Sequence, residues 1–208
     1  MKKNIVREGM IRAAAHLFRS RGYEGVGVAD LLQTSGTPRG SLYFHFPGGK
    51  EQIARETVLF VRERVLERLQ ALRAMGPAPG TYVSAVLNGW AEALLESDFQ
   101  KGCAVALIAL ETAQSSGPLR EVAQETFRQW NEEIARAAGD WGADPEEARC
   151  FASVLQSLIQ GAVVLARASH SIKPFEDAAQ AALALTPSWL STIQGQAAMA
   201  PSLPQESR

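Results

Sequence analysis

A stretch at residues 36–50, GTPRGSLYFHFPGGK, carries side chains whose chemistry suits a nucleic acid. Arg39 offers a guanidinium that can pair with the edge of guanine or with a phosphate. Ser41, Tyr43 and His45 add hydroxyl and imidazole groups of the kind that hold phosphates. Because these groups gather on one short element, the pattern favours contact with DNA over ordinary surface polarity.

The elements around this stretch predict two short helices joined by a tight turn. Val28, Leu31 and Leu32 have the i, i+3, i+4 spacing of an apolar helix face, and Gly36 ends that helix. We expect Thr37 to be the N-cap of a second helix that runs from Pro38 to Phe46. Two such helices form a helix-turn-helix, whose second helix enters the major groove.

The second helix is expected to divide into a buried and an exposed side. Leu42 and Phe46 are predicted to pack a small core, whereas Gly40 would allow close approach to DNA. Lys50 opens the next helix, so its ammonium and the helix amides could meet a phosphate together. The predicted DNA-binding residues are Thr37, Pro38, Arg39, Gly40, Ser41, Tyr43, Phe44, His45 and Lys50.

Several of these motifs together resemble the DNA-binding domain of the tetracycline-repressor (TetR) family. The resemblance spans about residues 11–54 and is most specific in GSLYFHF, at 40–46, followed by Lys50-Glu51. The PGGKE form is similar to the branch of the lincomycin-resistance repressors LmrA and YxaF. In this family the position of Val26 is often Thr, which caps the helix and touches a phosphate. Val26 cannot do so, and we expect Gly27 to cap instead.

The charge of the chain is unevenly distributed. The 208 residues have a net charge of −1. Residues 1–74 hold 13 Lys and Arg against 7 Asp and Glu, a net charge of +6, while the rest carries −7. A basic N-terminal third attached to an acidic remainder is typical of a DNA-contacting module joined to a body that does not contact DNA.

Helical periodicity continues along the rest of the chain and predicts an all-α fold of about nine helices. An N-terminal three-helix domain is expected at residues 1–48, with the helix-turn-helix at about 27–46. A helical domain for ligand binding and dimerisation is expected at 49–195, and a disordered tail at 196–208. A helix over 49–75, about 40 Å long at 1.5 Å per residue, is predicted to link the first two domains. The expected later helices cover 82–97, 102–114, 119–141, 146–168 and 175–185.

The second domain contains a mixture of aromatic and polar residues typical of a small-molecule pocket. For most of these residues, plain core packing is the alternative. Glu111 stands out, because an acid within CAVALIALETA is expensive to bury unless it is paired, for example with an arginine. The predicted ligand-binding residues are Trp90, Phe99, Cys103, Leu107, Glu111, Phe127, Trp130, Phe151, Leu155 and Gln156.

The last two helices are predicted to form a homodimer surface. Small residues there allow helices to approach closely, and two helices from each subunit would make a four-helix interface. The TetR resemblance implies the same arrangement. The predicted interface residues are Gln160, Gly161, Val164, Ala168, Ala178, Ala182 and Leu185.

These features predict a cytoplasmic, homodimeric transcriptional regulator without a cofactor, a metal or a membrane association. We expect a repressor that leaves a palindromic operator on double-stranded DNA when a small hydrophobic or aromatic effector binds. Its three histidines are scattered, and no nucleophile elbow or phosphate loop is present, so an all-α enzyme is disfavoured. A ligand-binding adaptor that no longer binds DNA is the other alternative, to which Val26 gives some weight.

Overall fold

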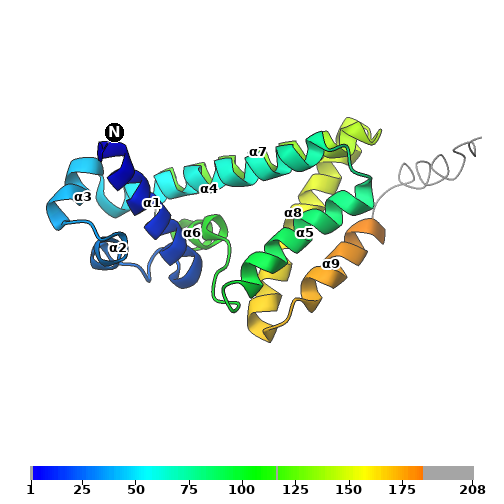
Figure 1. Ribbon diagram of the computed structural model, residues 1–208. Helices are drawn as coiled ribbons and strands as arrows, with labels where there is room; N and C mark the ends of the chain where they lie inside the picture. The colour runs from blue at the N-terminus through cyan, green and yellow to red at the C-terminus, as the bar shows by residue number, and fades with distance from the viewer. Residues whose placement is uncertain (1, 116, 185–208) are drawn as a thin grey trace, which may run out of the picture.

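The computed structural model describes residues 2–115 and 117–184, and its regular elements in these ranges are all α-helices (Figure 1). They confirm the prediction of an all-α chain with about nine helices. The helices are α1 (Lys2–Arg21), α2 (Val28–Ser35), α3 (Arg39–His45), α4 (Gly49–Ala74), α5 (Pro79–Leu95), α6 (Ala104–Thr112), α7 (Gly117–Asp140), α8 (Pro145–Ser169) and α9 (Lys173–Ala184). The predicted interface residue Leu185 and the predicted tail lie outside the described residues.

The first three helices enclose a small apolar core. Phe18 of α1, Leu31 of α2, and Leu42 and Phe46 of the α3 region are all buried. Val26, in the turn before α2, is fully buried in the same core. Buried side chains therefore hold the short helices α2 and α3 in place, because helices of 8 and 7 residues are only marginally stable alone.

Helix α2 begins and ends as its sequence predicts. Gly27 is the N-cap, and its N–H donates to Oδ2 of Asp30 at 2.8 Å. Gly36 ends the helix in the left-handed conformation, at φ 65°, which costs glycine little. The prediction that Gly27 caps this helix in place of the residue at 26 is confirmed.

The start of α3 differs from the prediction. Thr37 is not the N-cap: its hydroxyl donates to the Ser35 carbonyl at 3.5 Å. Pro38 occupies the N-cap position instead, and its carbonyl accepts the Ser41 N–H at 2.9 Å. The helix thus begins at Arg39, one residue later than expected, because proline supplies an extended N-cap residue whose missing amide is not needed.

Helix α4 leaves the three-helix unit and runs to the far end of the molecule, with α7 packed beside it (Figure 1). Polar bonds join the two helices at two places. The Trp130 indole donates to the Arg62 carbonyl at 3.2 Å. Near the far end, Arg73 pairs with the buried Glu133 and with Asp140. The α4–α7 pair therefore forms the long axis along which the rest of the body packs.

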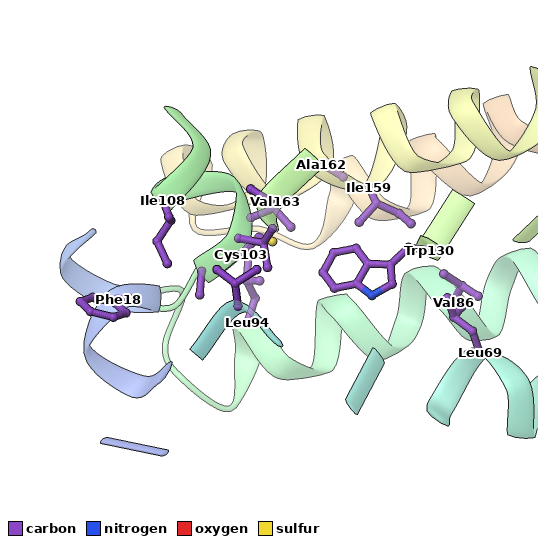
Figure 2. Close-up of a cluster of buried hydrophobic side chains, with 14 of the residues drawn as sticks. Phe18, Leu69, Val86, Leu94, Cys103, Ile108, Trp130, Ile159, Ala162 and Val163 are labelled. Atoms are coloured by element: carbon purple, nitrogen blue, oxygen red, sulfur yellow. The ribbon is translucent and has the colours of Figure 1, made fainter. Parts of the chain in front are cut away.

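Large apolar side chains from α4, α5, α7 and α8 pack together beside the α4–α7 pair. Figure 2 shows the Trp130 ring among them, with Leu69 and Val86 on one side and Ile159 on the other. Helix α9 closes the body by packing on α5 and α8. These contacts form a core that is continuous with that of the N-terminal helices. The predicted domain boundary at residue 48 stays a prediction.

Helix α8 is long and apolar enough to cross a membrane by length and composition, the one such helix among the described residues. It packs against α5, α7 and α9, and its inward face includes the buried Phe151, Leu155 and Ile159. This packing supports its interpretation as a core helix of the body.

Candidate nucleic-acid interface

Helix α3 presents one face to solvent while the other anchors it. The anchors are Leu42 and Phe46, both fully buried, as predicted. Tyr43 and Phe44 point the opposite way and are 51% and 65% exposed. Two exposed aromatic residues on one short helix are unusual for a solvated surface, and they give this face capacity for contact with a partner.

The first turn of α3 is accessible. Arg39 and Gly40 are exposed, and a side chain added at Gly40 would meet nothing within 4 Å. Arg39 has no ion pair within the described parts of the chain. Its guanidinium is therefore free to reach a base edge or a phosphate from the helix N-terminus, where recognition helices make such contacts.

The remaining predicted contact residues surround this turn. Pro38 is exposed, whereas Thr37, Ser41 and His45 are half-buried. The Nδ1 atom of His45 is buried and has no hydrogen-bond partner among the described residues. The nine predicted residues thus gather on α3 and its flanks. Their individual contacts with DNA stay predictions.

Lys50 lies in the first turn of α4, as predicted, and a neighbouring ring fixes its side chain. Its Nζ is 4.1 Å from the centroid of the Tyr23 ring, a cation–π contact. The Tyr23 ring packs at a tilt of 52° against Phe18 of α1, with ring centroids 5.8 Å apart. The ammonium is therefore positioned beside the turn between α1 and α2.

The structure does not bring the ten predicted ligand residues together. Trp90 and Cys103 line a cavity of about 600 Å³, whereas Phe151 lines a different cavity of about 280 Å³. Trp130 and Leu155 are buried in the core, and Gln156 is nearly so. As ligand contacts, these residues stay predictions.

Three further members of the predicted pocket are only half-buried. The Phe127 ring packs edge-on against Trp130, and the Phe99 ring lies 5.3 Å from His170. Leu107 lies near Gly102, at the start of α6.

Cys103 is the N-cap of α6, and burial raises the pKa of its thiol, which keeps it protonated.

Glu111 does not face inward, and the expectation that it does is wrong. It is exposed, and its Oε2 accepts the Glu24 N–H at 2.7 Å, so this oxygen pairs with a backbone amide and not with an arginine. Its other oxygen lies so close to Gly22 that a Cβ there would be 2.0 Å away. A single acidic residue in an apolar helix marked a contact between α6 and the N-terminal unit.

A second contact joins the same two regions. The N–H of Gly102, in the α5–α6 loop, donates to the Arg19 carbonyl at 2.7 Å, and the Arg19 Nε donates back to the Gly102 carbonyl at 3.0 Å. Arg167 of α8 holds the same loop through the carbonyls of Phe99 and Gln100. The loop therefore connects α1 with α8.

The predicted dimer residues fall into two groups. Gly161, Val164 and Ala168 lie on the exposed side of α8, where Val164 is 64% exposed. Ala178 and Ala182 are instead buried, because α9 turns this face toward α5 and α8 of its own chain. The expectation that these two alanines lie on a free surface is wrong. Gln160 is half-buried, with its Nε2 atom enclosed.

The large cavity contains residues that the sequence interpretation missed. Arg12 and Arg19 of α1 and Arg64 and Arg68 of α4 line it together with the apolar side chains of α4 and α5. The spacing i, i+4 places Arg64 and Arg68 on one helix face next to Val61, Val65 and Leu69. That spacing was a possible signal, and Arg64 and Arg68 are both exposed where they line the cavity.

Comparison with known proteins places this geometry in a family. The profile described as "Bacterial regulatory proteins, tetR family" matches residues 10–57. The profile described as "Transcriptional regulator LmrA/YxaF-like, C-terminal domain" matches residues 79–181. The first match covers the second half of α1, all of α2 and α3 and the start of α4, and the second runs from the start of α5 into α9.

Individual proteins agree. The chain is 31% identical over 168 residues to the HTH-type transcriptional regulator LmrA of Bacillus subtilis, covering 81% of this chain and 89% of that protein. It is 32% identical over 168 residues to YxaF of the same organism, covering 81% and 88%. A TetR transcriptional regulator from Legionella pneumophila shares the fold, with a TM-score of 0.79 at 17% identity, covering 86% of this chain and 96% of that one. The protein therefore belongs to the TetR family of DNA-binding transcriptional regulators, in the group with an LmrA/YxaF-like C-terminal domain.

Proposed function

We propose that the protein is a homodimeric repressor that binds a palindromic operator through α3 and releases it when a small molecule binds the helical body. The observation that carries this proposal is the exposed face of α3. Arg39, Gly40 and Tyr43 are accessible there, while Leu42 and Phe46 fix the helix to its core. Such an arrangement exposes base-reading groups on a rigid support.

Dimerisation is supported by the outer side of α8. Val164 and Leu165 are 64% and 60% exposed, next to the small residues Gly161 and Ala168. An apolar helix face of this kind is suited to an isologous contact, in which the same surface of two copies pairs about a twofold axis. Regulators of this family act as dimers with small-molecule effectors. A dimer with two α3 helices would read two half-sites of a palindrome.

Release by a small molecule requires that the effector favours a conformation with the wrong spacing of the two α3 helices. Helix α4 is the proposed coupling element, because it starts directly after α3 and ends in the body (Figure 1). As a cytoplasmic protein it would meet both its operator and its effector in the same compartment.

The variant Arg39→Ala tests the DNA-binding role of α3. Its affinity for DNA from the promoter next to its own gene should fall by about 1–3 kcal/mol, roughly five- to 150-fold, because a base or phosphate contact is lost. Arg120→Ala is the matched control, since Arg120 is also exposed but lies on α7. Fluorescence anisotropy with labelled duplexes measures both variants.

Equal promoter affinity in the wild type and Arg39→Ala would contradict the proposed role of α3. Undisturbed small-molecule binding without any promoter binding would favour the adaptor, in which the helix-turn-helix no longer holds DNA. Turnover of a bound compound would favour an enzyme.

A further inference from the structure

The larger of the two cavities described above lies between the N-terminal unit and the body. It has a volume of about 600 Å³, within the roughly 300–1,000 Å³ of small-molecule sites. Its walls come from α1, α4, α5 and the start of α6. Figure 1 shows how α5 returns from the far end of α4 toward α6 and α1. A molecule in this cavity would touch both parts of the protein.

The lining of the cavity is divided between apolar side chains and arginines. Its apolar side chains include Phe60, Val65 and Leu69 of α4 and Val86 and Trp90 of α5. The charged residues that line it are four arginines, and none of the described lining residues is acidic. A long apolar wall with a cluster of one charge sign is complementary to an amphipathic molecule of the opposite sign.

The arginines are poorly compensated. Arg64 and Arg68 have no ion pair in the ranges that the structure describes, and Arg12 meets Glu8 only at 3.7 Å on an exposed surface. The Nε of Arg19 donates a hydrogen bond to the Gly102 carbonyl. Burial has the largest effect on the pKa of Arg19 and lowers it; Cys103 opposes this effect, the nearby charge of Arg68 lowers the pKa further, and Glu96 opposes it least. Two guanidiniums from α1 and α4 thus repel each other at the cavity.

We propose that the effector of this regulator is an amphipathic anion: a carboxylate or sulfonate head group on an aromatic or aliphatic body. Its head group binds Arg19, Arg64 and Arg68, and its body lies along Phe60, Leu69, Val86 and Trp90. This inference rests on the proposed function for its regulatory meaning, since it names the chemical class of the effector.

Binding of such an anion connects the two parts of the protein directly. Arg19 belongs to α1 of the DNA-binding unit, whereas Arg64 and Arg68 belong to α4. A carboxylate or sulfonate between them replaces repulsion by charge-assisted hydrogen bonds, which are about twice as strong as neutral ones. The anion therefore favours the arrangement of α1 and α4 in which the arginines converge, and DNA affinity changes by that preference.

A matched pair of fluorescent dyes tests the proposal on the full-length protein without DNA. The probes are anilinonaphthalene sulfonate and N-phenyl-naphthylamine, which is the same dye without the sulfonate. The sulfonate dye should bind at least about tenfold more tightly than the neutral dye, because hydrogen bonds to charged groups add to the shared apolar contact. Arg68→Gln should remove most of this difference, while the control Arg120→Gln should keep it.

Two glycine variants tell whether the dyes bind in this cavity. A side chain at Gly89 would meet nothing within 4 Å and would enter the cavity that this residue lines. Gly89→Leu should therefore weaken both dyes. Gly139→Leu is the control, because Gly139 is also an exposed, unobstructed helical glycine but lies on α7. Gly89→Ala provides a milder plug if the leucine variant does not fold.

Equal affinities for the two dyes would overturn the proposal. An unchanged affinity of Arg68→Gln or Gly89→Leu for the sulfonate dye would do the same, since the anion would then be bound elsewhere. These outcomes are separate from the proposed function: loss of operator binding leaves the dye result intact, and a failed dye result leaves operator binding intact.

Discussion

Because residue 26 is a valine, the N-terminus of α2 has to be capped by other residues. Val26 is fully buried in the core of the N-terminal unit and offers no hydroxyl to α2 or to a phosphate. The N-terminus of α2 relies instead on Gly27 and Asp30, whose carboxylate accepts the Gly27 N–H and pairs with Arg21 at 3.1 Å. Residue 30 therefore stabilises the helix that supports α3.

The charge of Asp30 gives this cap a pH dependence. The Gly27 N–H, and then the Arg21 guanidinium, hold the pKa of Asp30 below its usual value. Because the folded-state pKa is lowered, ionised Asp30 stabilises the fold above the unfolded-state pKa of about 3.9. This stabilisation is lost as the pH falls below that value and through the lower folded-state pKa. Melting temperatures of the wild type and Asp30→Asn should therefore differ at pH 7 and converge toward pH 3. A constant difference over this range would contradict the assignment.

Trp130 and Trp90 should behave differently although both were candidates for a ligand pocket. Trp130 is 1% exposed and packs in the core, so Trp130→Ala should lower the free energy of unfolding by about 3–5 kcal/mol. Trp90 is half-exposed at the cavity, and Trp90→Ala should cost less stability but weaken dye binding. Urea denaturation at a fixed protein concentration compares the two. Equal losses of stability would argue against this separation.

Periodicity within a single helix predicted which residues are buried. It did not predict burial or exposure that depends on contacts between helices. The sequence identified Leu42 and Phe46 as anchors because their spacing within one short helix already places them on the same apolar face. The exposure of Glu111 and the burial of Ala178 depend on how α6 and α9 sit against other helices, which local spacing does not encode. The arginine cluster likewise arises only because α1 lies against α4.

At the scale of elements, α6 contacts the turn after α1 through a pair of residues that fit each other tightly. Gly22 has φ 75°, which disfavours any other residue, and its Cα faces the Glu111 carboxylate. Next to it, the Glu24 N–H donates to Glu111, and Arg19 and Gly102 exchange two hydrogen bonds. They make α6 a route by which the body holds the DNA-binding unit.

A double-mutant cycle measures this contact. Gly22→Ala should lower the free energy of unfolding by about 1–2 kcal/mol through its left-handed conformation, and by more through the clash with Glu111. In the Glu111→Ala background only the conformational part remains, so the same glycine substitution should cost less. Thermal or urea denaturation of the four proteins gives the coupling. Strict additivity would show that the two residues do not interact.

At the scale of the whole molecule, the outer side of α8 decides whether two α3 helices act together. Val164→Asp places a charge at the centre of the proposed interface, where it would be buried without a partner, so the dimer should weaken strongly. Gln180→Asp is a control, because Gln180 is exposed on α9 and outside the predicted set. Sedimentation velocity over a concentration series should show monomers for Val164→Asp and dimers for the control. Dimers of both variants would place the interface elsewhere.

The central claim is sequence-specific DNA binding by a dimer. Its most direct test is a titration of DNA from the promoter next to the protein's own gene and of a random duplex of equal length, over a series of salt concentrations. We predict that the protein binds the promoter far more tightly than the random duplex at any fixed salt concentration, with two subunits or a multiple of two per duplex. Equal binding of both duplexes that fades alike with salt would contradict it, because phosphate contacts alone produce that behaviour.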